Sequence, residues 1–228
     1  MRLIALATAV AEPTLCLRDG ARIAGAWRGP PRCGPEPILA AVRDLLAGAG
    51  LDFSALDGIA FGRGPGAFTG VRLGVALAQG LSLGTGLPLM PVSDLAALAW
   101  TGYRRHGWAR VLACLDARQG EVYWGAYACT PERIEMVGKE HIAMPQALNP
   151  PPGDWAWVGN GVPLAAPKVS AQAFDMALVP AAEAVAELGM QALVRGETTP
   201  LAEAMPHYLR DRVARPSPRY RRRRSLLG

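Results

Sequence analysis

Short apolar runs joined by tight connections open the chain. Residues 2–8 and 14–18 are apolar runs, and Arg18-Asp19-Gly20 is a turn that leads into a third run at 21–27. Runs of this length with such short connections are typical of neighbouring antiparallel strands. The pattern therefore predicts a three-stranded meander at the start of the chain.

The apolar spacing then becomes helical. After a Pro- and Gly-rich loop at 29–37, apolar residues recur at helical intervals from Ile38 to Leu46, and glycines at 48 and 50 follow. Glycine is common just beyond a helix C-terminus, so a helix is predicted to end there. Four further elements are expected in this order: a strand at 58–61, a helix from about Thr69 to Leu83, a strand near Leu87 to Val92, and a helix after a Ser93 N-cap.

The resulting order, βββαβαβα, resembles the ribonuclease H-like sheet that is duplicated in actin-like and sugar-kinase-like proteins. A strand at 110–115, a turn at 116–120 and a strand at 121–128 restart the pattern, which indicates a second, related domain. The fold class predicted is therefore α/β, an actin-like tandem two-domain fold of mixed sheets with flanking helices.

The second half is less regular than the first. It contains a Pro-rich loop at 145–153, a strand at 155–158 and a helix near 181–194. We expect a first actin-like domain with the partner-binding helices at 1–100, a second, degenerate actin-like domain at 101–209, and a disordered Arg-rich tail at 210–228.

Charge is concentrated at the end of the chain. Half of the 228 residues are hydrophobic and 19% are charged, which is the composition of a folded protein. The net charge is +5, but residues 210–228 carry eight Arg and one Asp, so residues 1–209 have a net charge of −2. A nucleic-acid hypothesis therefore depends on the tail.

Metal-binding and disulfide patterns are absent from the sequence. No two cysteines form a CxxC pair, and no two histidines have the spacing that places two ligands on one helical face. We expect no metal and no cofactor. The residues concerned are Cys16, Cys33, Cys114, Cys129, His106, His141 and His207.

Two apolar stretches raise the question of export or membrane insertion. Residues 1–11 resemble a signal peptide, but they hold one Arg and are needed as a strand beside the next one. Residues 73–93 contain 21 residues without a charge, yet Gly and Pro interrupt them as in a helix, turn and strand. A cytoplasmic protein is expected.

The glycine-rich segment at 62–74 follows a predicted strand and opens a predicted helix. Phosphate-binding loops occupy this position, because free backbone N–H groups point outward there. The segment lacks the Gly-Lys-Ser/Thr of a Walker A loop and does not fit GxGxxG. A tight turn and a phosphate loop both stay open on composition alone.

The helix that follows carries glycines in its interior. Gly74 and Gly80 each cost about 1 kcal/mol relative to Ala, so some contact must offset them. The helix is apolar almost all round, which predicts burial in its own fold or by a partner. Two rows of small residues could each admit a second helix closely: Gly70, Gly74 and Ala78, and Ala76, Gly80 and Gly84.

Four segments in the same order resemble the TsaB family. Residues 64–74, GPGAFTGVRLG, are similar to the family signature GPGSFTGxRxG, and residues 88–98, PLMPVSDLAAL, to IPxxGVSSLxAL. Residues 116–123, DARQGEVY, are similar to DARRGEVY, and residues 206–210, PHYLR, to PxYLR. The family-motif residues are Gly64, Pro65, Gly66, Thr69, Asp116, Arg118 and Glu121.

This resemblance implies a non-catalytic subunit of the complex that forms N6-threonylcarbamoyladenosine at position 37 of tRNAs reading ANN codons. It implies a heterodimer with TsaD, the transferase, and recruitment of TsaE, an ATPase; a homodimer is an alternative for the free protein. The matching helices lie at about 36–47 and 69–84. The expected interface residues are Leu39, Val42, Arg43, Leu46, Phe68, Gly70, Val71, Arg72, Gly74, Ala78 and Leu81.

Departures from the family bear on an enzymatic alternative, either an actin-fold ATPase or a metallopeptidase-like enzyme. In the first strand the family usually reads ILAIDTS, and Ala7 here replaces the acidic residue. That carboxylate helps to hold metal and phosphates in active actin-like enzymes, so its loss disfavours hydrolysis. Residues 33–36, CGPE, replace the usual His-Ser/Ala motif, which affects the details of the interface there.

Two polar regions each have two possible interpretations, one structural and one functional. Asp116, Arg118 and Glu121 at the second hairpin either stabilise the turn or contact TsaD or TsaE. The tail is either a solvated run or a grip on tRNA phosphates, for which the candidates are Arg219, Arg221, Arg222, Arg223 and Arg224.

Overall fold

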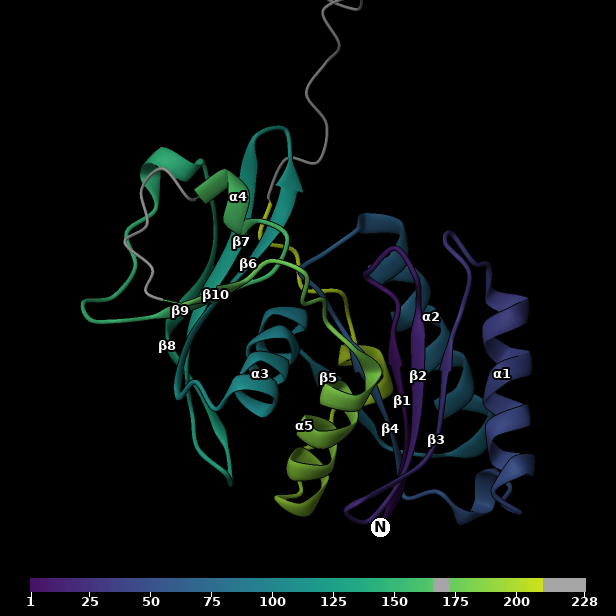
Figure 1. Ribbon diagram of the computed structural model, residues 1–228. Helices are drawn as coiled ribbons and strands as arrows, with labels where there is room; N and C mark the ends of the chain where they lie inside the picture. Colours follow the sequence, from purple (N-terminus) through teal and green to yellow (C-terminus); the bar gives the residue numbers. More distant parts are fainter. Residues whose placement is uncertain (166–172, 211–228) are drawn as a thin grey trace, which may run out of the picture.

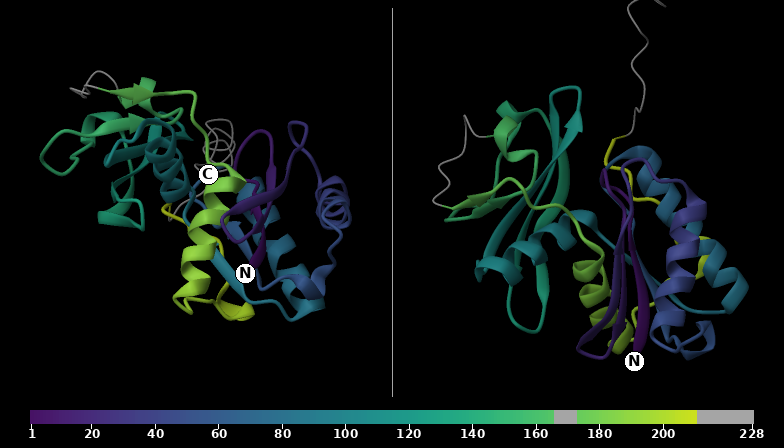
Figure 2. Two further views of the ribbon diagram at one scale, coloured as in Figure 1. Left: turned by 60° about the horizontal axis from the view of Figure 1, so that its bottom comes forward. Right: turned by 45° about the vertical axis from the view of Figure 1, so that its right-hand side comes forward.

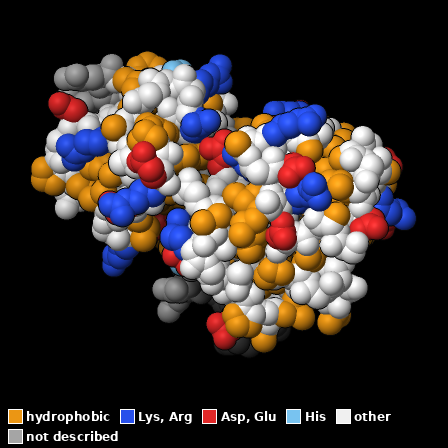
Figure 3. Space-filling model, turned by 90° about the horizontal axis from the view of Figure 1, so that it is seen from below, with side chains coloured by type: hydrophobic (Ala, Val, Ile, Leu, Met, Phe, Trp, Pro, Cys, Tyr) orange, Lys and Arg blue, Asp and Glu red, His pale blue; other side chains and the backbone are white. Residues whose placement is uncertain are grey.

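The computed structural model describes residues 1–165 and 173–210, which form two five-stranded sheets with helices between and outside them (Figure 1). Of the expected tail at 210–228, Arg210 is described, whereas residues 211–228, with the arginines at 219 and 221–224, lie outside the described residues. Seen from below, the molecule has two lobes on which charged side chains of both signs are interspersed with apolar ones (Figure 3).

The first sheet has the order β3-β2-β1-β4-β5. Strands β1, β2 and β3 form the predicted antiparallel meander, and β4 and β5 continue the sheet parallel to β1. The bounds are β1 (Arg2–Ala7), β2 (Thr14–Asp19), β3 (Arg22–Arg28), β4 (Gly58–Gly62) and β5 (Leu89–Val92).

The second sheet repeats this topology. Its order is β8-β7-β6-β9-β10, with β6, β7 and β8 antiparallel and β9 and β10 parallel to β6. The bounds are β6 (Arg110–Arg118), β7 (Glu121–Cys129), β8 (Ile134–Ala143), β9 (Ala156–Val158) and β10 (Phe174–Asp175). The duplicated, actin-like arrangement predicted from the restart at residue 110 is confirmed.

Alternation along β1 directs its side chains to two different cores. Ile4 and Leu6 pack with α1 (Pro35–Gly48) and α2 (Phe68–Thr85) on the outer face of the first sheet. Leu3 and Ala5 pack with α3 (Asp94–His106) and α5 (Ala182–Val194), which lie between the sheets. The first sheet is therefore covered on both faces, and the inner core continues into the second sheet.

Helix α5 returns to the first sheet although it follows the strands of the second (Figure 2). It packs on β1 and β4, and Gly189 makes this contact close: a Cβ added there would lie 2.4 Å from the Cβ of Ala60. The first sheet and the helices packed on it thus include residues from both halves of the chain.

The sequence pattern did not predict β8, β10 or the short helix α4 (Val162–Ala165). Strand β8 is an edge strand whose residues are exposed or only half-buried, so it lacks the apolar alternation of a buried strand. Its Gly138-Lys139-Glu140 segment resembles a loop in sequence. In the described parts of the chain, the helices are too short or too polar to cross a bilayer.

Candidate functional site

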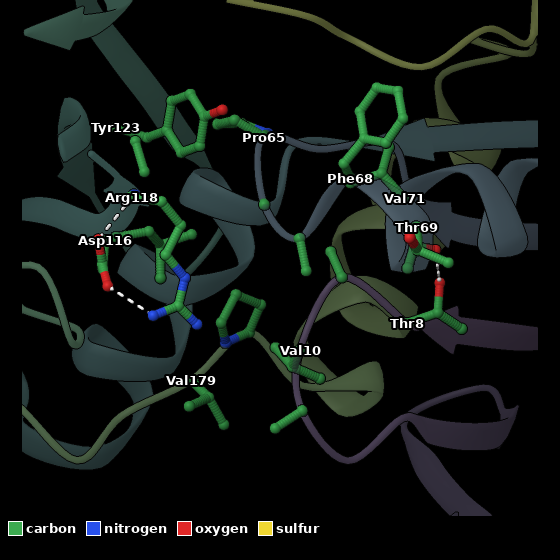
Figure 4. A pocket seen from close by; sticks show the side chains of 18 of the residues that line it. Thr8, Val10, Pro65, Phe68, Thr69, Val71, Asp116, Arg118, Tyr123 and Val179 are labelled. Carbon is green, nitrogen blue, oxygen red and sulfur yellow. Dashed lines mark hydrogen bonds and ion pairs between the residues drawn. The ribbon is translucent and has the colours of Figure 1, made fainter. Parts of the chain in front are cut away.

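A cleft of about 1030 Å³ lies between the two sheets (Figure 4). Its walls are the connection after β1 at 8–13, the start of α2 at 65–71, the β6–β7 hairpin at 115–119 and the C-terminal segment at 207–210. Strands β1 and β6 occupy equivalent places in the two sheets, and the hairpins that follow them both line the cleft.

The glycine-rich segment provides close packing beside this cleft. A Cβ at Gly70 would lie 2.1 Å from the backbone oxygen of Thr8, and one at Gly74 would lie 2.3 Å from the Thr8 hydroxyl. The Thr8 Oγ1 also donates to the Gly70 carbonyl at 2.8 Å. These contacts offset the conformational cost of glycine and favour the tight-packing interpretation over a phosphate loop.

Carboxylates are scarce in the cleft. Ala7, where the family carries an acid, is fully buried in the inner core. Among the described residues that line the cleft, the one acidic side chain is Asp116. The first sheet therefore contributes no carboxylate at the position that would hold a metal–phosphate ligand.

The two small-residue rows of α2 have different environments. The row that contains Gly70 and Gly74 is filled by Thr8 of the chain itself, which corrects the expectation that each row could admit a second helix. At Gly80 and Gly84 an added Cβ would meet nothing within 4 Å, and Leu83 beside them is 77% exposed. Among the described residues, the second row is therefore left uncovered by the chain's own fold.

The expected interface residues divide in the same way. Val42, Leu46, Val71, Gly74 and Ala78 are buried in the chain's own fold. The half-buried members are Leu39, Gly70 and Leu81, and the exposed members are Arg43, Phe68 and Arg72.

An aromatic and cationic cluster joins the start of α2 to the C-terminal segment. The Arg72 guanidinium carbon lies 3.8 Å from the centroid of the Phe68 ring, and its Nε donates to the Tyr208 hydroxyl at 2.8 Å. Phe68 and Tyr208 are 39% and 45% exposed, so this cluster presents apolar surface to solvent.

The hydrogen bonds of the β6–β7 hairpin match the interpretation in which its polar side chains stabilise the turn. Asp116 accepts the backbone N–H of Arg118 at 2.7 Å and its Nη1 at 3.1 Å, while Arg118 has a φ of 64°. Glu121 accepts from Arg210 Nη2 at 2.5 Å. The Arg118 side chain is still 85% exposed and points into the cleft, where a ligand or partner could reach it (Figure 4).

Sequence reasoning missed a buried polar junction between the sheets. Glu140 on β8 is only 7% exposed, accepts from the hydroxyls of Tyr127 and Ser93, and lies 3.6 Å from His207 Nε2. Burial, and then the Glu140 charge, raise the pKa of Tyr127 well above its usual value. The sequence signal for this junction was weak, because β8 lacks the apolar pattern of a strand and Ser93 already has a role as a helix cap.

Within the described residues, His, Cys, Asp and Glu side chains do not gather in groups of three that could hold a metal ion. The cysteines are unpaired, and burial raises the pKa of Cys16, Cys114 and Cys129 to about 12. None of these three thiols is poised as a nucleophile.

Two sheets of one topology, with helices between them and a cleft bounded by their equivalent hairpins, define an actin-like two-domain α/β protein. A family model described as TsaD, tRNA N6-adenosine threonylcarbamoyltransferase, matches residues 35–225. The tRNA threonylcarbamoyladenosine biosynthesis protein TsaB of Escherichia coli (strain K12) is 36% identical over 225 residues, covering 94% of this chain and 96% of that protein.

Other matches agree with this placement. YeaZ from Pseudomonas aeruginosa superposes with a TM-score of 0.85 at 38% identity, covering 91% of this chain and 99% of that one. The tRNA N6-adenosine threonylcarbamoyltransferase of Paracoccus denitrificans (strain Pd 1222) is 51% identical over only 70 residues, 31% of this chain and 20% of that protein. The chain belongs to the family of the matching model and, on the relatives that span its length, to the TsaB proteins of tRNA threonylcarbamoyladenosine biosynthesis.

Proposed function

We propose that the chain is a non-catalytic subunit of the cytoplasmic complex that forms N6-threonylcarbamoyladenosine at position 37 of tRNAs reading ANN codons. In this proposal it heterodimerises with TsaD and recruits TsaE. Family membership supports the pathway, and the observation that carries the subunit role is the open row of α2, which lies on the outer side of the first sheet.

The open row has the properties of a helix-packing surface. Ala76, Gly80 and Leu83 lie one turn apart on the exposed side of α2, with Phe68 and Arg72 at its N-terminal end. Glycines let a second helix backbone approach closely. Covering the Leu83 side chain contributes about 2 kcal/mol, which makes a helical partner favourable there.

Helix α1 extends this surface. It contacts α2, and its Arg43 is exposed beside the half-buried Leu39. A pair of helices with an apolar centre and a charged flank matches the polar rim and apolar core of protein interfaces. TsaD is the expected occupant, and a second copy is the alternative for the free protein.

Reconstitution tests this function directly. Purified TsaD, TsaE, tRNA and the threonylcarbamoyl donor are assayed with and without the chain, and modified adenosine is quantified by mass spectrometry. We expect the chain alone to make no product and the complete mixture to do so. Equal activity of TsaD in its absence would overturn the subunit role.

An actin-fold ATPase is the second candidate, because the N-terminus of α2 has no side-chain cap and lines the cleft between the two sheets. Calorimetry with ATP and Mg²⁺ distinguishes the two. Tight binding by the isolated chain, together with phosphate release, would favour the enzyme; the scarcity of cleft carboxylates predicts neither.

The basic tail is the remaining part of the proposal. Arg219, Arg221, Arg222, Arg223 and Arg224 are proposed to contact tRNA phosphates without sequence preference. A chain lacking residues 213–228 should lower the tRNA affinity of the assembled complex at fixed moderate salt and reduce its salt dependence. Unchanged affinity would remove this contact.

A further inference from the structure

Arg72, in the second turn of α2, is held in one orientation by two aromatic rings. Its guanidinium carbon lies 3.8 Å from the centroid of the Phe68 ring and 5.8 Å from that of the Tyr208 ring. Its Nε donates to the Tyr208 hydroxyl at 2.8 Å, and the two rings lie 5.8 Å apart. Cation–π contacts and this hydrogen bond restrict a side chain that is otherwise very mobile. Arg72 is therefore oriented before any partner binds.

The ring of Tyr208 is itself anchored through the residues on either side of it. The His207 N–H donates to the Arg63 carbonyl at 2.8 Å, and Arg210 donates to the Glu121 carboxylate at 2.5 Å. Because the segment is fixed before and after the ring, the phenol stays beside the guanidinium.

The Arg72 guanidinium has unused hydrogen-bond donors. Its Nε is bound to Tyr208, whereas its two Nη groups have no hydrogen-bond or carboxylate partner in the described part of the chain. Exposed arginines elsewhere, such as Arg28 and Arg133, do pair with a carboxylate of the chain. Two adjacent Nη groups form the fork that binds both oxygens of a carboxylate. Arg72 is thus arranged to receive an anion from outside the chain.

Arg72 also begins the exposed stripe of α2 that contains the open row. It lies four residues before Ala76, and Gly80 and Gly84 follow at the same interval, so the four positions share one face of the helix. Arg72 is the single charged residue of α2. A helix that covers the open row also removes water from this charge, which is unfavourable unless a counter-charge is supplied.

We propose that the partner helix that packs on the open row carries an Asp or Glu whose carboxylate binds the two Nη groups of Arg72. This inference rests on the proposed function, since it names the chemistry of the partner at the same surface. The carboxylate is expected about two turns of helix from the residue that packs on Gly80, because Arg72 and Gly80 are about 12 Å apart along the axis. A helix with an apolar or basic residue at that place leaves the Arg72 charge buried and unpaired, so the pair makes binding selective.

An RNA phosphate is the other anion that could bind Arg72. The exposed stripe beyond it consists of Ala76, Gly80, Leu83 and Gly84, which offer no further cation and no aromatic ring to a nucleotide chain. The same small residues suit close packing of two helices. The stripe therefore favours a carboxylate on a protein partner.

The proposal is tested by calorimetry of the whole chain with TsaD at low and high salt. Arg72→Met keeps an apolar stem and removes the charge, so we expect at least about tenfold weaker binding at low salt and the loss of most of the salt dependence. Tyr208→Phe keeps the ring and removes the acceptor for Nε, so about fivefold weaker binding with the salt dependence retained is expected. Arg105→Met, at an exposed position near the end of α3, is the control and should bind like the wild type.

A charge exchange identifies the partner group. Arg72→Glu should bind TsaD at least as weakly as Arg72→Met, and one TsaD variant with Lys at the position of an acidic surface residue should restore binding to Arg72→Glu. Restoration by none of the TsaD variants that together cover its acidic surface residues would overturn the inference.

The remaining outcomes separate this inference from the proposed function. Equal TsaD binding by the wild type and Arg72→Met would overturn the inference and leave the proposed function standing. Weaker tRNA binding by the assembled complex with Arg72→Met, at unchanged TsaD affinity, would replace the carboxylate by an RNA phosphate. Absence of TsaD binding by the wild-type chain would refute the proposed function and the inference together.

Discussion

Arg210 reaches back from the end of the described chain to Glu121 on the second sheet, with its Nη2 2.5 Å from the carboxylate and 3.0 Å from the Ala117 carbonyl. The same segment is held to the first half of the chain: the His207 N–H donates to the Arg63 carbonyl just after β4 at 2.8 Å, and Arg72 on α2 donates to the Tyr208 hydroxyl at 2.8 Å. The C-terminal segment thus joins both sheets along one side of the cleft.

Breaking the ion pair between Arg210 and Glu121 should lower the stability of the chain. Arg210→Ala leaves the half-buried Glu121 carboxylate and the Ala117 carbonyl without their donor, so we expect a loss of about 2 kcal/mol in urea unfolding. Arg195→Ala is the matched control, because Arg195 and Glu197 form a solvent-exposed pair whose loss should affect stability much less. Equal effects of the two changes would refute a structural role for the pair.

Two glycines of α2 should respond oppositely to alanine. Gly80→Ala adds helix propensity in open space and should stabilise the chain by about 1 kcal/mol. Gly70→Ala places a methyl group 2.1 Å from the Thr8 carbonyl and should destabilise it by about 1–3 kcal/mol. Thermal unfolding of both variants decides this; stabilisation by Gly70→Ala would contradict the packing described here.

Asp94, the first residue of α3, is fully buried, and this burial raises its pKa to about 7. The raised pKa predicts a stability that depends on pH. Between its ordinary pKa of 3.8 and about 7, the folded chain holds a proton that the unfolded chain has lost, so stability falls as pH rises through this window and levels off above it. The full difference is on the order of 4 kcal/mol. The free energy of unfolding in urea, measured from pH 4 to 8, should fall more steeply with pH for the wild type than for Asp94→Asn. Parallel curves for the two proteins would exclude a contribution of Asp94.

Partner binding and stability should separate at Gly80. Gly80→Arg improves helix propensity but places a long charged side chain in the open row. We expect an unchanged or higher melting temperature and at least about tenfold weaker TsaD binding by calorimetry. Val194→Arg, at an exposed position near the end of α5, is the control and should bind normally. Normal binding by Gly80→Arg would place the partner elsewhere.

Thiol reactivity should single out Cys33. It is half-buried at the cleft, whereas Cys16, Cys114 and Cys129 are buried and have their pKa raised to about 12. A brief treatment of the native chain with iodoacetamide, followed by mass spectrometry, should label Cys33 first. Labelling of Cys114 at the same rate would show that the second sheet opens more readily than its packing implies.

Much of the fold was predictable because the decisive signals are local. The meander, the Ser93 cap and the restart at residue 110 each depend on neighbours in the sequence, and the structure confirms them. Strand β8 was not predictable, because an edge strand exposed to water needs no apolar pattern. The junction around Glu140 was missed with it.

The sequence by itself determined the repeated βββ pattern, the family motifs and the absence of a carboxylate at Ala7, since these follow from residue identity and order. Only the tertiary structure decided that Gly70 and Gly74 accommodate Thr8 while Gly80 and Gly84 stay open. Both rows have the same spacing and composition, so sequence gives them one meaning. Which row is covered depends on which side of α2 the first sheet occupies, and long-range packing alone sets that.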